Sequence, residues 1–187
     1  GLALLAVFAL LVWVLRRRPT GDIVRLAAIA AAVLVVNEAL VGAMLVLFEW
    51  VEDDQSNGRA VSIAVHLVNT FLLLGALTLT AWWLGDGSRP TRPFPARERR
   101  LLGWATAGLM LVGAAGAITA LGATLFPAES LLDGIRDDFT GTFLVRLRWI
   151  HPVVAVATAV LLGWLAPQYA RFGGRVQRIG TILVWLV

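Results

Sequence analysis

Two histidines are the side chains best suited to carry chemistry in this chain of 187 residues. His66 lies within a long apolar stretch, and His151 lies at the start of another, directly before Pro152. Ionisable side chains are costly at membrane depth, so they usually face the interior of a helix bundle and mark a site. Neutral imidazole is a natural axial ligand of haem iron, which bundle helices can enclose. The alternative is that each histidine only hydrogen-bonds to a neighbouring helix or lies at the membrane interface.

Two arginines, Arg146 and Arg148, lie shortly before His151. Guanidinium groups pair with carboxylates through two parallel hydrogen bonds, so these side chains are candidates to bind the propionates of a haem held by His151. They are equally suited to reach lipid headgroups or to pair with Asp137 and Asp138. The sequence leaves these alternatives open.

Glu38 stands near the centre of an apolar stretch. A carboxyl group at that depth is kept neutral by burial, hydrogen-bonded to another helix, or part of a proton path. We favour the hydrogen bond to another helix. Asn69 and Thr70 follow His66 by three and four residues and therefore share its face of a helix. We expect them to orient the imidazole or to meet Glu38.

The apolar stretches that carry these residues are long enough to cross a bilayer. Hydrophobic residues make up 59% of the chain, more than a water-soluble fold can bury. A span needs about 20 apolar residues, and the stretches that approach this length are Leu26–Phe48, Val61–Leu84, Leu101–Phe126 and Trp149–Ala166. We interpret the shorter runs Gly1–Leu15 and Ile179–Val187 as incomplete spans. The sequence therefore predicts an all-α, polytopic transmembrane helix bundle, of which this chain is expected to be a part.

Charged residues alternate in sign from one connection to the next. The connections that contain Arg17, Arg97 and Arg175 are rich in arginine and are predicted to be cytoplasmic. The connections that contain Asp53 and Asp137 are acidic and are predicted to face outward. The net charge of +4 thus reflects membrane orientation, and no nucleic-acid partner is expected. Cysteine is absent, which excludes a disulfide or thiolate site in this chain.

The connection 86–100 is the best candidate for a boundary between two halves, because it contains three prolines and five arginines. We assign residues 1–85 to one half-bundle, 86–100 to a cytoplasmic linker and 101–187 to the start of a second half-bundle. Short similar segments that begin at Arg25 and Arg178 suggest an internal repeat. Small side chains in the third long stretch, Gly116 among them, predict close helix packing.

The chain resembles the haem A synthases, a family of eight-helix membrane proteins built from two pseudo-symmetric four-helix halves. The likeness covers the whole chain, and its strongest parts are Asn37–Ala43, Leu45–Trp50, Ala64–Leu74, Leu79–Trp83, Ala120–Pro127, Phe143–Arg148 and His151–Pro152. In that family the second, fourth, sixth and eighth helices each supply a haem-ligand histidine. The resemblance implies that this chain extends from the second helix, just past its histidine, to the start of the seventh.

The resemblance further implies that His66 belongs to an amino-terminal haem site and His151 to a carboxy-terminal one, so the two would not bind one iron. Each site would take its second histidine from outside this chain. The carboxylate near the second helix's histidine would also lie outside, so no catalytic residue is assigned and the isolated chain is expected to be inactive. The sequence departs from the commoner family pattern at Glu38, where glutamine is frequent, and in the long acidic segment Glu129–Asp138.

The family oxidises the methyl group of haem O to the formyl group of haem A for cytochrome oxidase assembly. The resemblance implies this activity in the bacterial plasma membrane rather than the mitochondrial inner membrane, with haem O near His66 and haem B as an electron-transfer cofactor near His151. The expected partners are membrane lipid, the haem substrate, haem O synthase and a second copy of the protein. Two alternatives are a haem-binding electron carrier without methyl oxidation and a small proton-coupled transporter that uses Glu38 and the histidines.

Overall fold

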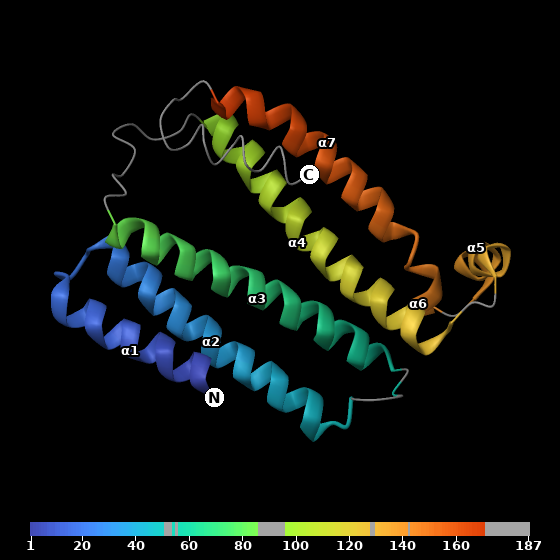
Figure 1. Cartoon of the computed structure of the whole chain (residues 1–187), viewed down its shortest axis with the longest axis horizontal. Helices are drawn as coiled ribbons and strands as arrows, with labels where there is room; N and C mark the ends of the chain where they lie inside the picture. Colours follow the sequence, from blue (N-terminus) through green and yellow to red (C-terminus); the bar gives the residue numbers. More distant parts are fainter. Residues whose placement is uncertain (51–53, 55, 86–95, 128–129, 142, 171–187) are drawn as a thin grey trace. The chain divides into compact units, whose positions relative to one another are not determined.

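The computed structural model describes residues 1–50, 54, 56–85, 96–127, 130–141 and 143–170, and all regular structure in these ranges is helical (Figure 1). The chain divides into two compact units, Gly1–Pro93 and Phe94–Val187. Helices long and apolar enough to cross a membrane are α2 (Ile23–Leu47), α3 (Asn57–Leu84), α4 (Ala96–Leu125) and Ile150–Pro167 of α7 (Ile150–Ala170). The predicted all-α membrane protein with four long spans is therefore confirmed.

The first unit is a row of three antiparallel helices in which α1 (Leu2–Arg17) and α3 lie along α2 (Figure 1). Small side chains of α2 form much of the core: Ala31 and Ala32 pack with Val7 of α1. A second cluster lies at one end of the unit and joins α1 and α3 to α2. It contains Val14, Val24, Ala28, Trp83 and Leu84. Small residues let helix axes approach closely, and this close packing stabilises the association of the helices. It is needed because apolar lipid provides no hydrophobic driving force for helix association.

Polar caps set the start of α2 and α3. The Asp22 carboxylate accepts the Val24 N–H at 2.9 Å, and the Ser56 hydroxyl accepts the Arg59 N–H at 3.2 Å. Each cap satisfies a backbone donor that the first helical turn leaves unpaired. Both helices therefore begin a few residues before the apolar stretches predicted from the sequence. Gly21 has a φ of +86°, which suits the left-handed backbone of the turn before Asp22.

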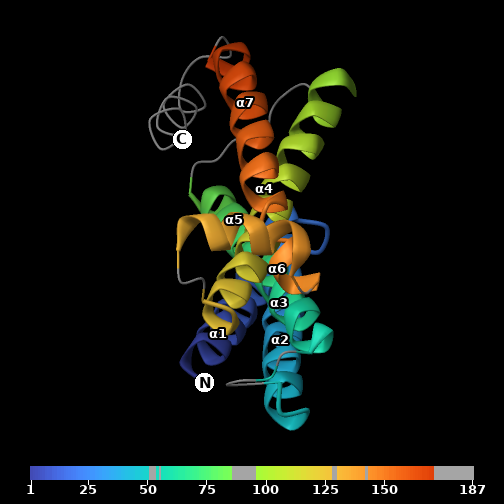
Figure 2. The same ribbon diagram turned by 90° about the vertical axis from the view of Figure 1, so that its right-hand side faces the viewer.

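In the second unit, α4 and α7 run antiparallel and pack along each other (Figure 1). Two short helices connect them: α5 (Leu131–Thr140) and α6 (Phe143–Arg146). Helix α5 runs crosswise to the two long helices (Figure 2). The acidic segment was predicted to be a loop, but it contains α5, whose first turn is capped by the Ser130 hydroxyl accepting the Asp133 N–H at 3.2 Å.

The last part of the predicted linker 86–100 is helical, because Ala96–Arg100 forms the first residues of α4. Arginine and glutamate are good helix formers, so the polar composition of this stretch did not prevent helix formation. The remainder of the predicted linker lies outside the described residues. So do Asp53, Arg175, the repeat segment that begins at Arg178 and the apolar run Ile179–Val187.

The first unit places the carboxyl end of α3 beside the arginine-rich turn between α1 and α2, as the predicted topology requires. We expect the turn at Thr20 to be cytoplasmic and the start of α3 at Asn57 to be outside. Both positions are exposed, and the chain has no cysteine of its own. Asn57→Cys should react with a membrane-impermeant maleimide in intact cells, and Thr20→Cys only after permeabilisation. Labelling of both from one side would contradict the topology.

Candidate functional site

A polar cluster joins α2 to α3 in the middle of the first unit, and Glu38 is its centre. The carboxylate accepts hydrogen bonds from the Thr70 hydroxyl on one oxygen and from the Asn69 amide on the other. His66 Nε2 lies 3.5 Å from the oxygen that Thr70 contacts. The prediction that Glu38 hydrogen-bonds to another helix is confirmed, and so is the expectation that Asn69 and Thr70 meet it.

Asn69 is the buried support of this cluster, with only 4% of its surface exposed. Its Nδ2 donates to the Leu34 carbonyl at 3.0 Å as well as to Glu38. Its Oδ1 accepts from Asn37 Nδ2 at 2.8 Å. The NH₂ group and the oxygen of the Asn69 amide therefore both bond to residues of α2. A 180° flip of the amide would break these hydrogen bonds. Asn37 was not predicted to take part in a site, although it directly precedes Glu38 in the sequence.

The two ring nitrogens of His66 have different surroundings. Nε2 faces the Glu38 carboxylate, which repels a nitrogen lone pair and favours a proton on Nε2. Nδ1 is buried and has no hydrogen-bond partner within the described residues. A neutral imidazole in this state has its lone pair on Nδ1. Because Nδ1 has no exposed surface and Nε2 faces Glu38, neither ring nitrogen of His66 is open to a metal in this conformation, and the contact ties the imidazole to α2.

His151 lies in the first turn of α7 against α4. Its Nδ1–H donates to the Val112 carbonyl at 3.2 Å, because a carbonyl can only accept. Neutral His151 therefore has the lone pair on Nε2, for which the described part of the chain provides no hydrogen-bond partner. This arrangement fits an axial ligand. Pro152 follows in the first helical turn, where a missing N–H costs no hydrogen bond.

Gly116 of α4 lets the His151 ring lie close to the helix. A Cβ atom at Gly116 would stand 3.1 Å from Cε1 and 3.3 Å from Nδ1 of the imidazole. Gly116 was predicted to allow close helix packing, and in the structure the group that packs against it is the His151 imidazole. Nothing in a single sequence distinguishes this glycine from its small neighbours.

Gly116→Val should therefore displace the His151 ring and disturb whatever His151 binds. We expect ligand bound at His151 to be retained about 10-fold less well, in the range seen when support of a metal ligand is removed. Gly103→Val in the same helix is the matched control, because nothing lies within 4 Å of a Cβ at Gly103. The absorbance of bound pigment per protein measures retention. Equal retention in the two variants would show that the close approach at Gly116 is not needed.

The predicted arginines differ in their surroundings. Arg148 is half-buried, and its Nε lies 3.1 Å from Asp138 Oδ1, which is the pairing that the sequence left open as an alternative. This ion pair joins the turn before α7 to the end of α5. Arg146 is exposed at the end of α6. Arg146 is therefore the more accessible of the two for a ligand carboxylate.

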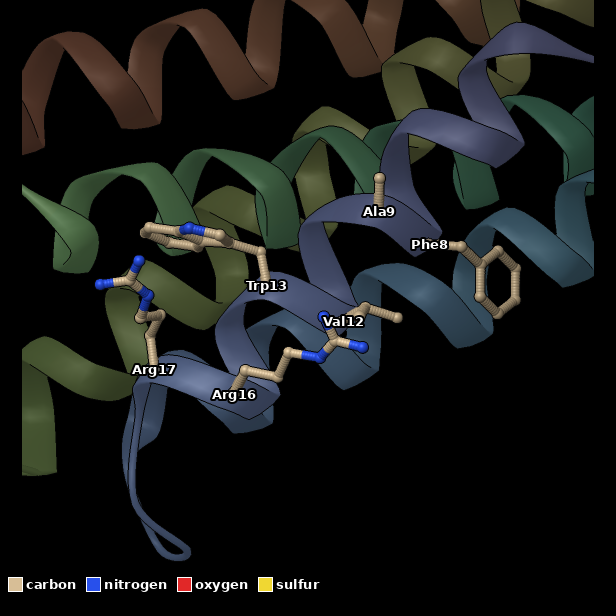
Figure 3. A pocket seen from close by; sticks show the side chains of 6 residues that line it. All are labelled: Phe8, Ala9, Val12, Trp13, Arg16 and Arg17. Atoms are coloured by element: carbon tan, nitrogen blue, oxygen red, sulfur yellow. The ribbon is translucent and has the colours of Figure 1, made fainter.

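A shallow depression lies on the outer face of α1, but it does not have the residues of a haem site. Its lining is Phe8, Ala9, Val12, Trp13, Arg16 and Arg17 (Figure 3). These side chains include neither a histidine nor a carboxylate, so the depression offers no iron ligand. Tryptophan and arginine at the end of a span are typical anchors at the membrane surface. We interpret this face as lipid-exposed.

All 187 residues match the COX15-CtaA family, described as cytochrome oxidase assembly protein. The chain belongs to this family. The resemblance to haem A synthases is thereby confirmed, and a COX15-CtaA chain has a role in cytochrome oxidase assembly. Its apolar helices place it in contact with membrane lipid.

The curated relatives of this COX15-CtaA chain include proteins named protoheme IX farnesyltransferase from two strains of Thermus thermophilus. Each is 45% identical over 166 residues, which are 86% of this chain. The chain spans only 27% of the length of these relatives. No solved structure is significantly similar to it.

Proposed function

We propose that the protein oxidises the methyl group of haem O to the formyl group of haem A in the bacterial plasma membrane. The observation that carries this proposal is the state of His151 at the start of α7. Its Nδ1–H donates to the Val112 carbonyl, and its Nε2 has no protein partner among the described residues, as expected of an axial ligand of haem iron. Family membership supports this proposal, and the name of the relatives, protoheme IX farnesyltransferase, supports haem as the class of substrate but not the oxidation.

His66 would hold the haem substrate and His151 a haem B that passes electrons. Haem, when bound, supplies the redox chemistry, and the protein supplies ligation, orientation and exclusion of competing reactions. Arg146, exposed before α7, would pair with a propionate of the haem at His151. Arg148 is already paired with Asp138, so its role would be to hold the start of α7 in place. A haem O synthase would supply the substrate.

Conversion of haem in a living host tests this function. The complete gene is expressed in a bacterium that makes haem O but has no haem A synthase, and the extracted haems are separated by chromatography. We expect haem A to appear with the wild-type protein and to be absent with His66→Ala. Bound haem without any haem A would favour the electron carrier. Purified protein without a Soret band would contradict both and favour the proton-coupled transporter.

A further inference from the structure

Arg16 and Arg17 form one end of the depression on the outer face of α1. Both side chains are exposed, and neither forms an ion pair in the part of the chain that the structure describes. The next arginine differs, because Arg18 Nη1 lies 3.8 Å from the Asp22 carboxylate. The depression therefore has two positive charges at one end that no carboxylate of the described residues neutralises.

The rest of the depression is apolar and follows the helix. Its further lining residues are Phe8, Ala9, Val12 and Trp13. Because residues four apart stand one above the other on a helix, Val12 lies below Arg16 and Trp13 below Arg17, as Figure 3 shows. Nine residues of helix separate Phe8 from Arg17, which is about 14 Å. One leaflet of a bilayer core is about 15 Å thick, so the depression matches its depth.

An acidic phospholipid has the chemistry that this depression would recognise. Helix α1 packs along the membrane-spanning helix α2, so its outer face lies at the depth of the bilayer. Guanidinium groups bind phosphate oxygens through paired hydrogen bonds, and the apolar part offers a surface to an acyl chain. Basic pockets at the cytoplasmic ends of membrane helices bind acidic lipid headgroups. The volume of about 540 Å³ has room for a headgroup and the upper part of a chain.

We propose that this depression binds one acidic phospholipid, with its phosphate at Arg16 and Arg17 and an acyl chain along Val12 and Trp13. The lipid would belong to the leaflet that we predict to be cytoplasmic. This inference does not depend on haem or on the proposed oxidation. The competing explanation is that the two arginines only set the orientation of α1. Arginines with that role alone predict no preference for one headgroup and no effect of Trp13.

Native mass spectrometry of the protein expressed from its complete gene tests the proposal. The purified protein is titrated in mild detergent with phosphatidylglycerol and, separately, with phosphatidylcholine. We expect one phosphatidylglycerol to bind in preference to phosphatidylcholine. Arginine near an anionic lipid contributes roughly a factor of five to binding, so Arg16→Gln together with Arg17→Gln should weaken phosphatidylglycerol about 25-fold. Arg18 and Arg25 remain in the turn and preserve the orientation of the helix.

A matched control removes the same charge elsewhere. Arg99 and Arg100 are exposed in the first turns of α4 and are not part of the depression. Their joint substitution by glutamine should leave the affinity for phosphatidylglycerol unchanged. An equal loss in this control would show that only the total charge matters, and the proposal would be wrong.

Trp13→Ala tests the apolar part without a change of charge. Trp13 is about half-exposed, so the substitution removes a wall of the depression and leaves the core of the unit intact. We expect phosphatidylglycerol to bind severalfold more weakly. Unchanged affinity would mean that no acyl chain lies along α1, which would overturn the proposal.

The source of the phosphate is the last point to test. Glycerol phosphate carries the same anionic group without acyl chains, and we expect it not to displace the lipid when both are present at equal concentration. Displacement would identify a site for small anions and contradict a lipid site. Equal binding of phosphatidylcholine and phosphatidylglycerol would contradict it as well.

Discussion

We expect His151→Ala to remove one haem signal from the complete protein and to leave a second one in place, and we expect His66→Ala to do the converse. Low-spin iron with two imidazole ligands depends on both of them, so loss of one changes the spectrum even where the porphyrin stays bound. We expect binding at the affected site to weaken about 100-fold or more, above the loss that follows removal of a supporting group. Electron paramagnetic resonance of the oxidised protein measures the two signals separately.

Gly103→Val is the control for both substitutions, because the Gly103 position in α4 has open space around it. Identical spectral changes in the two histidine variants would contradict the expectation. They would mean that one haem uses both side chains, and the assignment of His66 and His151 to separate sites would be wrong.

Asn69→Leu should destabilise the first unit more than any other single substitution in the polar cluster. It removes the bonds to Leu34, Glu38 and Asn37 at once. Hydrogen bonds between membrane helices contribute roughly 0.6 kcal/mol each, so the bonds together amount to about 2 kcal/mol. A carboxylate left short of partners adds to this loss. Unfolding in detergent, followed by circular dichroism, measures the change.

A double substitution separates the lost bonds from the stranded carboxylate. Replacing both partners of a buried polar pair with apolar groups is often nearly neutral, whereas replacing one is costly. We therefore expect Glu38→Leu to recover part of the stability when it is added to Asn69→Leu. Additive losses in the double variant would show that Asn69 and Glu38 are not coupled.

The four long spans could be predicted from the sequence because length and hydropathy are nearly sufficient to identify a membrane helix. The ends of the helices could not, since polar residues such as Asp22 and Ser56 begin helices by capping rather than by being apolar. Helix α5 was missed for a related reason. Its apolar residues Leu132, Ile135 and Phe139 recur at helical spacing, but aspartates and a glycine surround them.

The polar residues of the candidate sites were identified more easily than their roles. His66, Glu38, Asn69 and Thr70 stand out because polar side chains are rare within spans, and helical spacing predicts that three of them share a face. The tautomer of His151 depends on a hydrogen bond to the backbone carbonyl of Val112. No sequence pattern shows which carbonyl lies beside this histidine. The choice of Asp138 as the partner of Arg148 likewise depends on a short helix that the sequence did not predict.

The division of the polar cluster between two helices bears on how the protein is made. Glu38 belongs to α2, whereas its partners belong to α3, which is synthesised later. During translation α2 therefore enters the bilayer with an unpartnered carboxyl group, and charged residues near the centre of an inserting helix cost roughly 2.5–3.5 kcal/mol. The apolar remainder of α2 has to offset that cost alone. Insertion of α2 is thus a demanding step of biogenesis, and the arrival of α3 offsets part of its cost by supplying hydrogen-bond donors to Glu38.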